Sequence, residues 1–187
     1  MATLTPTLTL VSTDALTDSL NLSVTDSLSV LGQSKRFTKV LALTAKDILL
    51  AADYTKSYVF LQNKSSTTAE IITIGKKSTV GSAAYNNDPT IDLDSTANIS
   101  FGMSVSGTGI PGGATVISVT DTNTFELSAS TTGGAQSGET LTFGMEEFVI
   151  LGPGEFCFFP WDSTQDLEAI SASGTPTLEI MIFQAAA

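Results

Sequence analysis

Apolar residues recur at every second position in many short runs of this chain, and this period restricts its fold more than any other feature. Leu20, Leu22 and Val24 show it, as do Leu28 and Val30. Successive side chains of a strand point to opposite faces, so a period of two predicts strands with one apolar face. Ser and Thr make up more than a quarter of the 187 residues, which favours strands and turns over helices. The sequence therefore predicts an all-β protein.

Residues 36–75 have the composition of strands joined by polar turns. Tyr58–Gln62 and Ala69–Ile74 are rich in β-branched, aromatic and other apolar residues, and the polar residues 63–66 follow the first run. We expect the two runs to pair as a hairpin, because few residues connect them. Asp47–Ala52 is the only stretch whose composition suits a short helix.

The composition of the chain changes at about residue 78. Beyond that point glycine becomes more frequent, lysine disappears, and apolar density rises again only toward the C-terminus. Five short runs in this middle part predict strands: Ile91–Leu93, Met103–Val105, Thr115–Val119, Thr124–Leu127 and Thr140–Phe143. We therefore predict a discontinuous β-sandwich domain, jelly-roll-like, of residues 32–77 plus 146–187. Residues 78–145 interrupt it as an inserted small β-barrel or sandwich.

Residues 1–31 predict an extended N-terminal arm. The first thirty residues contain no aromatic residue and no glycine, so they have little with which to fold alone. We expect the arm to find strand partners on another element or another subunit, and a plain hairpin of the same domain is an equal alternative. The residues expected to make its contacts are Leu4, Leu8, Leu10, Leu20 and Leu22.

Charge is divided unevenly along the chain. Residues 1–77 hold eight basic and six acidic residues, for a net charge of +2, whereas residues 78–187 hold thirteen acidic and no basic residues, for −13. A surface this acidic repels phosphate groups, so we expect neither a nucleic-acid partner nor binding to a membrane surface. No apolar run approaches the roughly 20 residues that span a bilayer, and the N-terminus lacks the pattern of a signal peptide.

The residues needed for common catalytic and metal sites are scarce. Histidine is absent and Cys157 is the only cysteine, which removes Cys/His zinc sites and His-activated nucleophiles. Asp88, Asp92 and Asp94 lack the spacing of a calcium loop and indicate a solvated acidic face. Gly107–Gly112 has the letters of a dinucleotide loop, but a proline lies in it and a strand pattern follows, which predicts a tight turn. We expect no enzyme activity, cofactor, metal or small-molecule substrate.

The run Phe156-Cys-Phe-Phe-Pro-Trp161 carries the densest aromatic character in the chain. Alternation places Phe156 and Phe158 on one face of a strand, with Cys157 and Phe159 on the other. A strand that is apolar on both faces must be covered on both, either by a second sheet or by a partner. Phe156, Phe158 and Trp161 are therefore candidate contact residues, with packing in the chain's own core as the alternative.

Two groups of segments resemble proteins of tailed bacteriophages. The stretch from Leu49 to Gly75, with Ile150–Glu155 and the closing runs Leu167–Ile170 and Leu178–Phe183, is similar to small β-sandwich virion proteins. Residues Phe101–Val119 are similar to a β module inserted in phage structural proteins. The resemblance implies a structural component of the virion and transfers no catalytic residue.

These features together favour a capsid decoration, or cement, protein that binds the major capsid protein shell and stabilises the phage head. We expect it to be made in the host cytoplasm, to lie on the capsid surface and to form a homo-oligomer, most naturally a trimer. The basic residues between positions 35 and 77 are expected to face the shell, with Lys35, Arg36 and Lys39 as candidate contact residues, while the acidic portion keeps particles apart by repulsion. The alternative is a tail or fibre component whose inserted domain binds the host.

Overall fold

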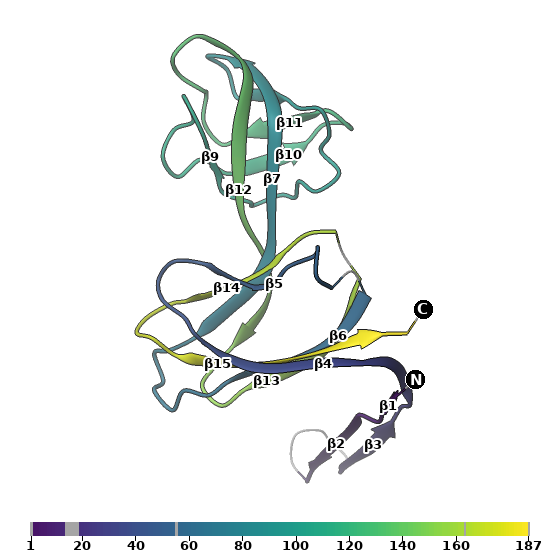
Figure 1. Cartoon of the computed structure of the whole chain (residues 1–187). Coiled ribbons are helices and arrows are strands. Elements are labelled where there is room, and N and C mark those ends of the chain that lie inside the picture. The colour runs from purple at the N-terminus through teal and green to yellow at the C-terminus, as the bar shows by residue number, and fades with distance from the viewer. Residues whose placement is uncertain (1, 14–18, 55, 163, 187) are drawn as a thin grey trace.

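The computed structural model describes residues 2–13, 19–54, 56–162 and 164–186, and within them it contains fifteen strands and no helix. Figure 1 shows two facing sheets that form a base, a second β part connected to one end of it, and a separate hairpin near the N-terminus. The prediction of an all-β protein with a β-sandwich is confirmed.

The first sheet of the base is antiparallel throughout and has the order β1–β4–β15–β6–β13. Its strands are β1 (Ala2–Leu4), β4 (Leu28–Val40), β6 (Lys56–Asn63), β13 (Phe156–Asp162) and β15 (Thr177–Ala185). Strict alternation along β6 buries Val59 and Leu61, and alternation along β15 buries Ile180 and Ile182. These side chains form one wall of the core.

The second sheet of the base supplies the opposite wall. Its strands lie in the order β12–β7–β14–β5 and are antiparallel, namely β5 (Lys46–Leu49), β7 (Ile72–Asn86), β12 (Ala135–Leu151) and β14 (Leu167–Ser171). Ile72, Ile74, Leu151 and Leu167 point from it toward the first sheet and are fully or almost fully buried. The base is therefore held together by apolar packing between two sheets, the main favourable term in folding.

The expected hairpin between Tyr58–Gln62 and Ala69–Ile74 is wrong. The strands β6 and β7 lie in different sheets, since β6 pairs with β13 and β15 while β7 pairs with β12 and β14. The Asn63 amide nitrogen donates to the carbonyl oxygens of Glu70 and Leu151 at 2.8 and 3.2 Å, which fixes the crossing of the chain between the sheets. Each strand instead pairs with strands far away in the sequence, because this arrangement buries its apolar side chains in the core between the two sheets.

The short helix suggested for Asp47–Ala52 is also wrong. Residues 46–49 form β5 and pair with β14, and a turn follows, with the Asp53 amide donating to the carbonyl oxygen of Leu50 at 3.0 Å. The sheet buries Ile48 and Leu49 against the core. A helix of six residues would gain little from propensity alone, so tertiary packing decides the conformation.

The inserted part is an open antiparallel sheet with its own core. It combines the far halves of β7 and β12 with β8 (Thr90–Asp92), β9 (Val105–Ser106), β10 (Val116–Val119) and β11 (Thr124–Leu127). Among the described strands the sheet does not close into a barrel. Its core contains Phe125 and Phe143, whose rings meet edge to face at 5.4 Å, and Ile91, Leu127 and Leu141.

The glycine-rich loop of residues 107–112 is a turn between β9 and the strand pairing that leads to β10, which confirms the prediction of a turn. Gly109 has a φ of +66°, a conformation that glycine adopts without strain. The hydroxyl of Tyr85 donates to the carbonyl oxygen of Thr108 and holds the loop against β7.

The strands β7 and β12 run without interruption from the core of the base into the core of the inserted part (Figure 1). The boundaries expected at residues 78 and 145 therefore fall inside two paired strands instead of in loops. The inserted residues 78–145 carry six acidic and no basic residues, while the base segments carry eight basic and ten acidic residues. Most of the unbalanced charge thus lies away from the base.

Candidate interaction surface

The outward side of the first sheet, which the second sheet does not cover, is apolar over parts of β6, β13 and β15. In β6, Tyr58 and Phe60 alternate with the buried residues, and in β15 Met181 and Phe183 do the same. All four side chains are half-buried. Because these strands lie next to each other, the four side chains form a continuous surface.

The edge strand β13 extends this surface with two more aromatic rings. Phe156 and Phe158 point outward and keep 60% and 37% of their area exposed. Phe158 stacks on Tyr58 with ring centres 6.2 Å apart, and Phe156 stacks on Phe60 at 5.9 Å. We call this surface the aromatic face; it consists of Tyr58, Phe60, Phe156, Phe158, Met181 and Phe183.

A second apolar surface lies on the N-terminal hairpin of β2 (Thr7–Ser12) and β3 (Leu20–Thr25). Leu8 pairs with Val24 and Leu10 with Leu22, so these four side chains share one side, and all are exposed. On the other side Thr7 and Thr25 share a hydrogen bond between their hydroxyls at 3.0 Å. We call Leu8, Leu10, Leu22 and Val24 the hairpin face.

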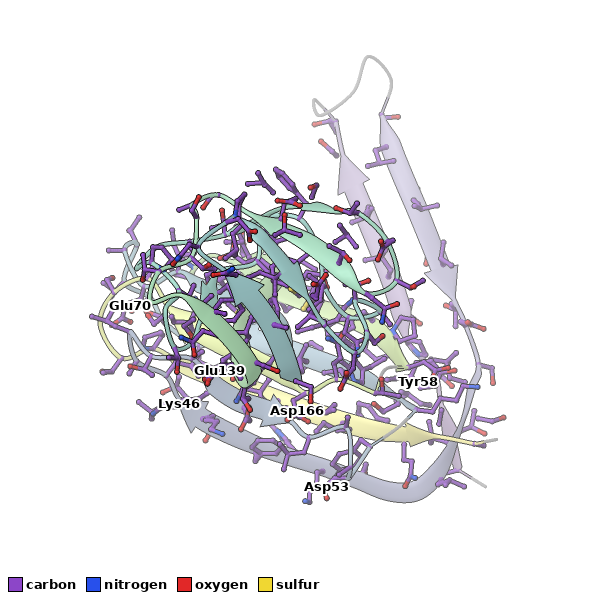
Figure 2. All side chains as sticks on the ribbon, turned by 90° about the horizontal axis from the view of Figure 1, so that it is seen from above. Lys46, Asp53, Tyr58, Glu70, Glu139 and Asp166 are labelled. Atoms are coloured by element: carbon purple, nitrogen blue, oxygen red, sulfur yellow. The ribbon has the colours of Figure 1, made fainter. Side chains whose placement is uncertain are left out.

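The hairpin is joined to the base through β1, not through its own strands. Leu4 is the register partner of Leu28 in β4, and the Asp26 amide closes the hairpin by donating to the carbonyl oxygen of Pro6 at 3.1 Å. The strands β2 and β3 form a separate two-stranded sheet, and Figure 2 shows it projecting away from the body of the protein. The structure therefore has features of both alternatives for residues 1–31. The strand β1 pairs with β4 of the base, and β2 and β3 form a hairpin outside the sheets of the base.

A groove of about 580 Å³ lies between the base of the hairpin and the aromatic face. One wall is formed by Leu4, Pro6, Thr7 and Leu8, and the other by residues of β6, β13 and β15. The lining contains no charged side chain. An uncharged concave surface of this kind is a site for apolar contact with another molecule.

One end of the outward face is polar and charged. Glu179 of β15 is nearly covered, and Arg36 and Lys64 contact its carboxylate oxygens at 2.5 and 3.7 Å. The hydrogen bond from Arg36, together with the charges of both cations, lowers the pKa of Glu179. This ion-pair cluster limits the apolar surface on one side.

The candidate basic residues do not form a common surface. Arg36 lies on the outward face, whereas Lys35 packs over the Tyr54 ring at 5.6 Å, and the ammonium of Lys39 donates to the carbonyl oxygen of Asp47. The reason is the alternation of β4, which sends residues 35 and 39 to the side opposite residue 36. The prediction that these three residues face one partner is not supported by their directions.

Trp161 is not a surface residue. It exposes only 5% of its area and belongs to the core of the base, where it stacks on Phe148 with ring centres 6.1 Å apart. In the register of β13, Phe156 and Phe158 share the outward face, while Cys157, Phe159 and Trp161 share the inward one. Trp161 therefore fits the alternative of core packing, and the two phenylalanines lie where a contact is feasible.

Of the arm residues, Leu8, Leu10 and Leu22 lie on the hairpin face, and Leu20 lies on the same side of the hairpin but is half-buried. Leu4 lines the groove, together with Leu8. Sequence reasoning missed Val24, which completes the hairpin face. It also missed four members of the aromatic face: Tyr58, Phe60, Met181 and Phe183. The alternation of these residues with buried ones was visible, but which side the second sheet covers is a property of the assembled sandwich.

A polar hollow of about 440 Å³ lies where the base meets the inserted part. Lys76 and Glu146 face each other there at 3.2 Å, and the hydroxyl of Ser100 donates to Glu146 at 3.1 Å. These groups satisfy one another, so the hollow offers weaker grounds for a binding site than the groove. Within the described ranges, no three His, Cys, Asp or Glu side chains are grouped as ligands for a metal ion.

Comparison of the chain with models of protein families, with curated proteins and with solved structures gives no match in any of the three. The described residues contain no helix long and apolar enough to cross a membrane.

Proposed function

We propose that the protein is a structural component of a tailed-phage virion, namely a decoration protein that binds the major capsid protein shell and stabilises the head. The observation that carries the proposal is the pair of open apolar surfaces, the aromatic face and the hairpin face. Exposed apolar surface is unfavourable in water, so covering these two surfaces with other protein chains would stabilise the assembly. The proposal assigns no catalytic step to any residue.

The arrangement of the parts supports one orientation on a particle. Figure 1 places the inserted part and the hairpin at opposite ends of the base. The inserted part carries a net charge of −6, so directed outward it would keep neighbouring particles apart by repulsion. The base and the hairpin, with their apolar surfaces, would then face the shell and adjacent copies.

The basic residues contribute less to this orientation than the sequence suggested. Each of the eight Lys and Arg side chains contacts an acid, a carbonyl oxygen or an aromatic ring of its own chain, for example Lys76 with Glu146 and Lys77 with Glu168 at 3.1 Å. Each basic side chain thus already has a partner in its own chain, although several of them, such as Lys56 beside Asp162, remain exposed. The proposal therefore rests on apolar contact and on self-association, most simply as a trimer at threefold positions of the shell.

The test is the number of copies on purified particles, measured by quantitative mass spectrometry and by electron microscopy. A decoration protein is expected at hundreds of equivalent positions over the head, and particles lacking it should open at lower temperature. A few copies at a single vertex would contradict the proposal and favour a tail or fibre component. The inserted part gives that alternative little support, because a site that binds a host glycan usually presents exposed aromatic rings. Among its described aromatic side chains only Phe101 is exposed, at 78%, whereas Tyr85, Phe125 and Phe143 are buried.

A further inference from the structure

We infer that the hairpin of one copy lies in the groove of a second copy, so that its hairpin face covers the aromatic face. The inference assigns the self-association surface that the proposed function requires, and it rests on that function only for the expectation that copies meet. The partner is thus a second copy of this chain, bound through the strands β2 and β3.

The chemistry of the two surfaces is matched. The hairpin face presents four aliphatic side chains, and the aromatic face presents five rings and a methionine. Neither surface carries a charge, although the whole chain has a net charge of −11. Two copies of so acidic a chain repel each other over most orientations, and these surfaces let them approach without placing carboxylates in contact.

The hairpin itself needs a partner. A two-stranded sheet is marginally stable in water, and a third strand or a packed apolar side is required to stabilise it. Here Leu10 and Leu22 face solvent, and β2 and β3 pair with no other described strand. The groove supplies the missing packing, with Phe156 and Phe158 exposed at its edge.

The size of the surfaces favours an arrangement in which every copy both gives its hairpin to a neighbour and receives one, over a single contact between two copies. Each strand of the hairpin has six residues, so the whole hairpin is roughly 20 Å long and about 10 Å wide, and the hairpin face covers only part of it. One such contact is small beside the roughly 800 Å² that each partner buries in a standard interface. Exchange gives every copy two contacts, one through its hairpin and one through its groove. A set of copies that closes into a ring satisfies all of them.

The hairpin of the second copy would bind next to the receiving copy's own hairpin, because the base of that hairpin lines the groove. Leu4 and Pro6 of the receiving copy form one wall of the groove, so the incoming leucines would contact the base of the resident hairpin as well as the rings. Each hairpin would therefore leave its own base at Pro6 and reach the neighbour without unpairing β1 from β4.

The test uses disulfide trapping between two differently tagged proteins, both with Cys157→Ser so that each has one thiol. The first carries Leu22→Cys and the second Phe158→Cys, and each is first shown to keep the wild-type circular dichroism spectrum. After mixing and mild oxidation, we expect the mixed disulfide at least about ten-fold faster than with Phe101→Cys in the second protein, because the contact raises the local thiol concentration. Leu10→Cys serves as a second donor position.

Equal rates for Phe158→Cys and Phe101→Cys would overturn the inference. It would also fail if a doubly substituted chain formed the bond only within itself, since its own hairpin would then fill the groove. The experiment contains no capsid shell, so its outcome is separate from that of shell binding. Copies that exchange hairpins but do not bind particles would leave this inference intact and contradict the proposed function.

Discussion

Leu10 of β2 and Leu22 of β3 are register partners on one side of the N-terminal hairpin, and they leave 42% and 41% of their areas in solvent. Two leucines that face each other across a hairpin usually pack onto a third layer. Here β2 and β3 pair with no further described strand, and the apolar groove lined by Leu8 and by residues of the aromatic face lies at the base of the hairpin. The two exposed leucines therefore indicate that the hairpin packs against an apolar surface outside its own two-stranded sheet.

Replacing both leucines, as Leu10→Thr with Leu22→Thr, should weaken self-association and leave the base folded. Threonine keeps the strand preference but loses about 1.5 kcal/mol of apolar contact per residue, which together weakens association by more than about 100-fold. Analytical ultracentrifugation over a dilution series measures the effect. Val11→Thr, on the other side of the hairpin, is the matched control and should associate like the wild type.

Replacing the two exposed rings of β13, as Phe156→Thr with Phe158→Thr, should have the same effect from the other side of the contact. Because both rings are partly exposed, the free energy of unfolding should fall by only about 1 kcal/mol per ring, which leaves the base folded. Phe101→Thr removes an exposed ring from the inserted part and serves as the control. Loss of association in the Phe101 variant alone would place the contact on the inserted part and contradict the account.

The ion pair of Glu179 predicts a pH-dependent stability difference. Its pKa lies below the ordinary value of 4.5 in the folded protein, so its contribution is present above that value and is lost as the pH falls through the folded pKa. Glu179→Gln should therefore be less stable than the wild type at neutral pH, and the difference should shrink as the pH falls below 4.5 and through the lowered pKa of the folded protein. Urea unfolding over this range measures it.

Glu168, whose pKa is raised mainly by burial, acts in the opposite direction but is present in both proteins and cancels in the difference. Glu147→Gln, at an exposed position of β12, is the control for the change in net charge. A stability difference between wild type and Glu179→Gln that stays constant from neutral to acid pH would count against the ion pair.

The two cores should respond separately to mutation. Phe125 is fully buried in the inserted part, and Phe125→Ala should cost about 3–5 kcal/mol there. Hydrogen exchange should then speed up in residues 83–143, while Trp161, the only tryptophan, keeps the fluorescence of the folded base. Equal loss of protection in both parts would mean that β7 and β12 couple the cores into one unfolding unit.

Cys157 should react slowly in the folded protein. Burial raises the pKa of its thiol to about 11, from an ordinary value of 9.0, so at pH 8 the thiolate is about 100-fold scarcer than in a free cysteine. The rate of reaction with a thiol reagent should rise to that of a free cysteine when the protein is unfolded in denaturant. Fast reaction in the folded state would show that β13 separates from the core often enough to expose the Cys157 thiol to the reagent.

Local patterns in the sequence predicted the strands well because alternation is a local property. Leu20, Leu22 and Val24 form β3 as their spacing indicates, and Phe156 and Phe158 share the outward side of β13. Pairing is different, since it depends on contacts far apart in sequence. The strands β6 and β7 have the appearance of a hairpin, yet their partners are β13 and β15 on one side and β12 and β14 on the other.

The candidate surface could be predicted only in part for the same reason. The aromatic run of β13 was visible in the sequence, but Trp161 at its end points inward and belongs to the core. Met181 and Phe183 lie about 120 residues from Tyr58 and Phe60 in the chain, and only the pairing of β15 with β6 brings them together. Lys35, Arg36 and Lys39 illustrate the limit for charge, because alternation sends neighbours in the sequence to opposite sides.

The most direct test of the central claim is the mass in solution of the full chain and of a variant without the hairpin. Leu4 and Leu28 are register partners, so Thr5–Ser27 can be replaced by Asn-Gly, which closes β1 onto β4 as a two-residue turn. Light scattering should give a multiple of the 19.4 kDa chain mass for the full chain, about 58 kDa for the proposed trimer, and a single chain for the variant. Equal masses for the two proteins would contradict the account.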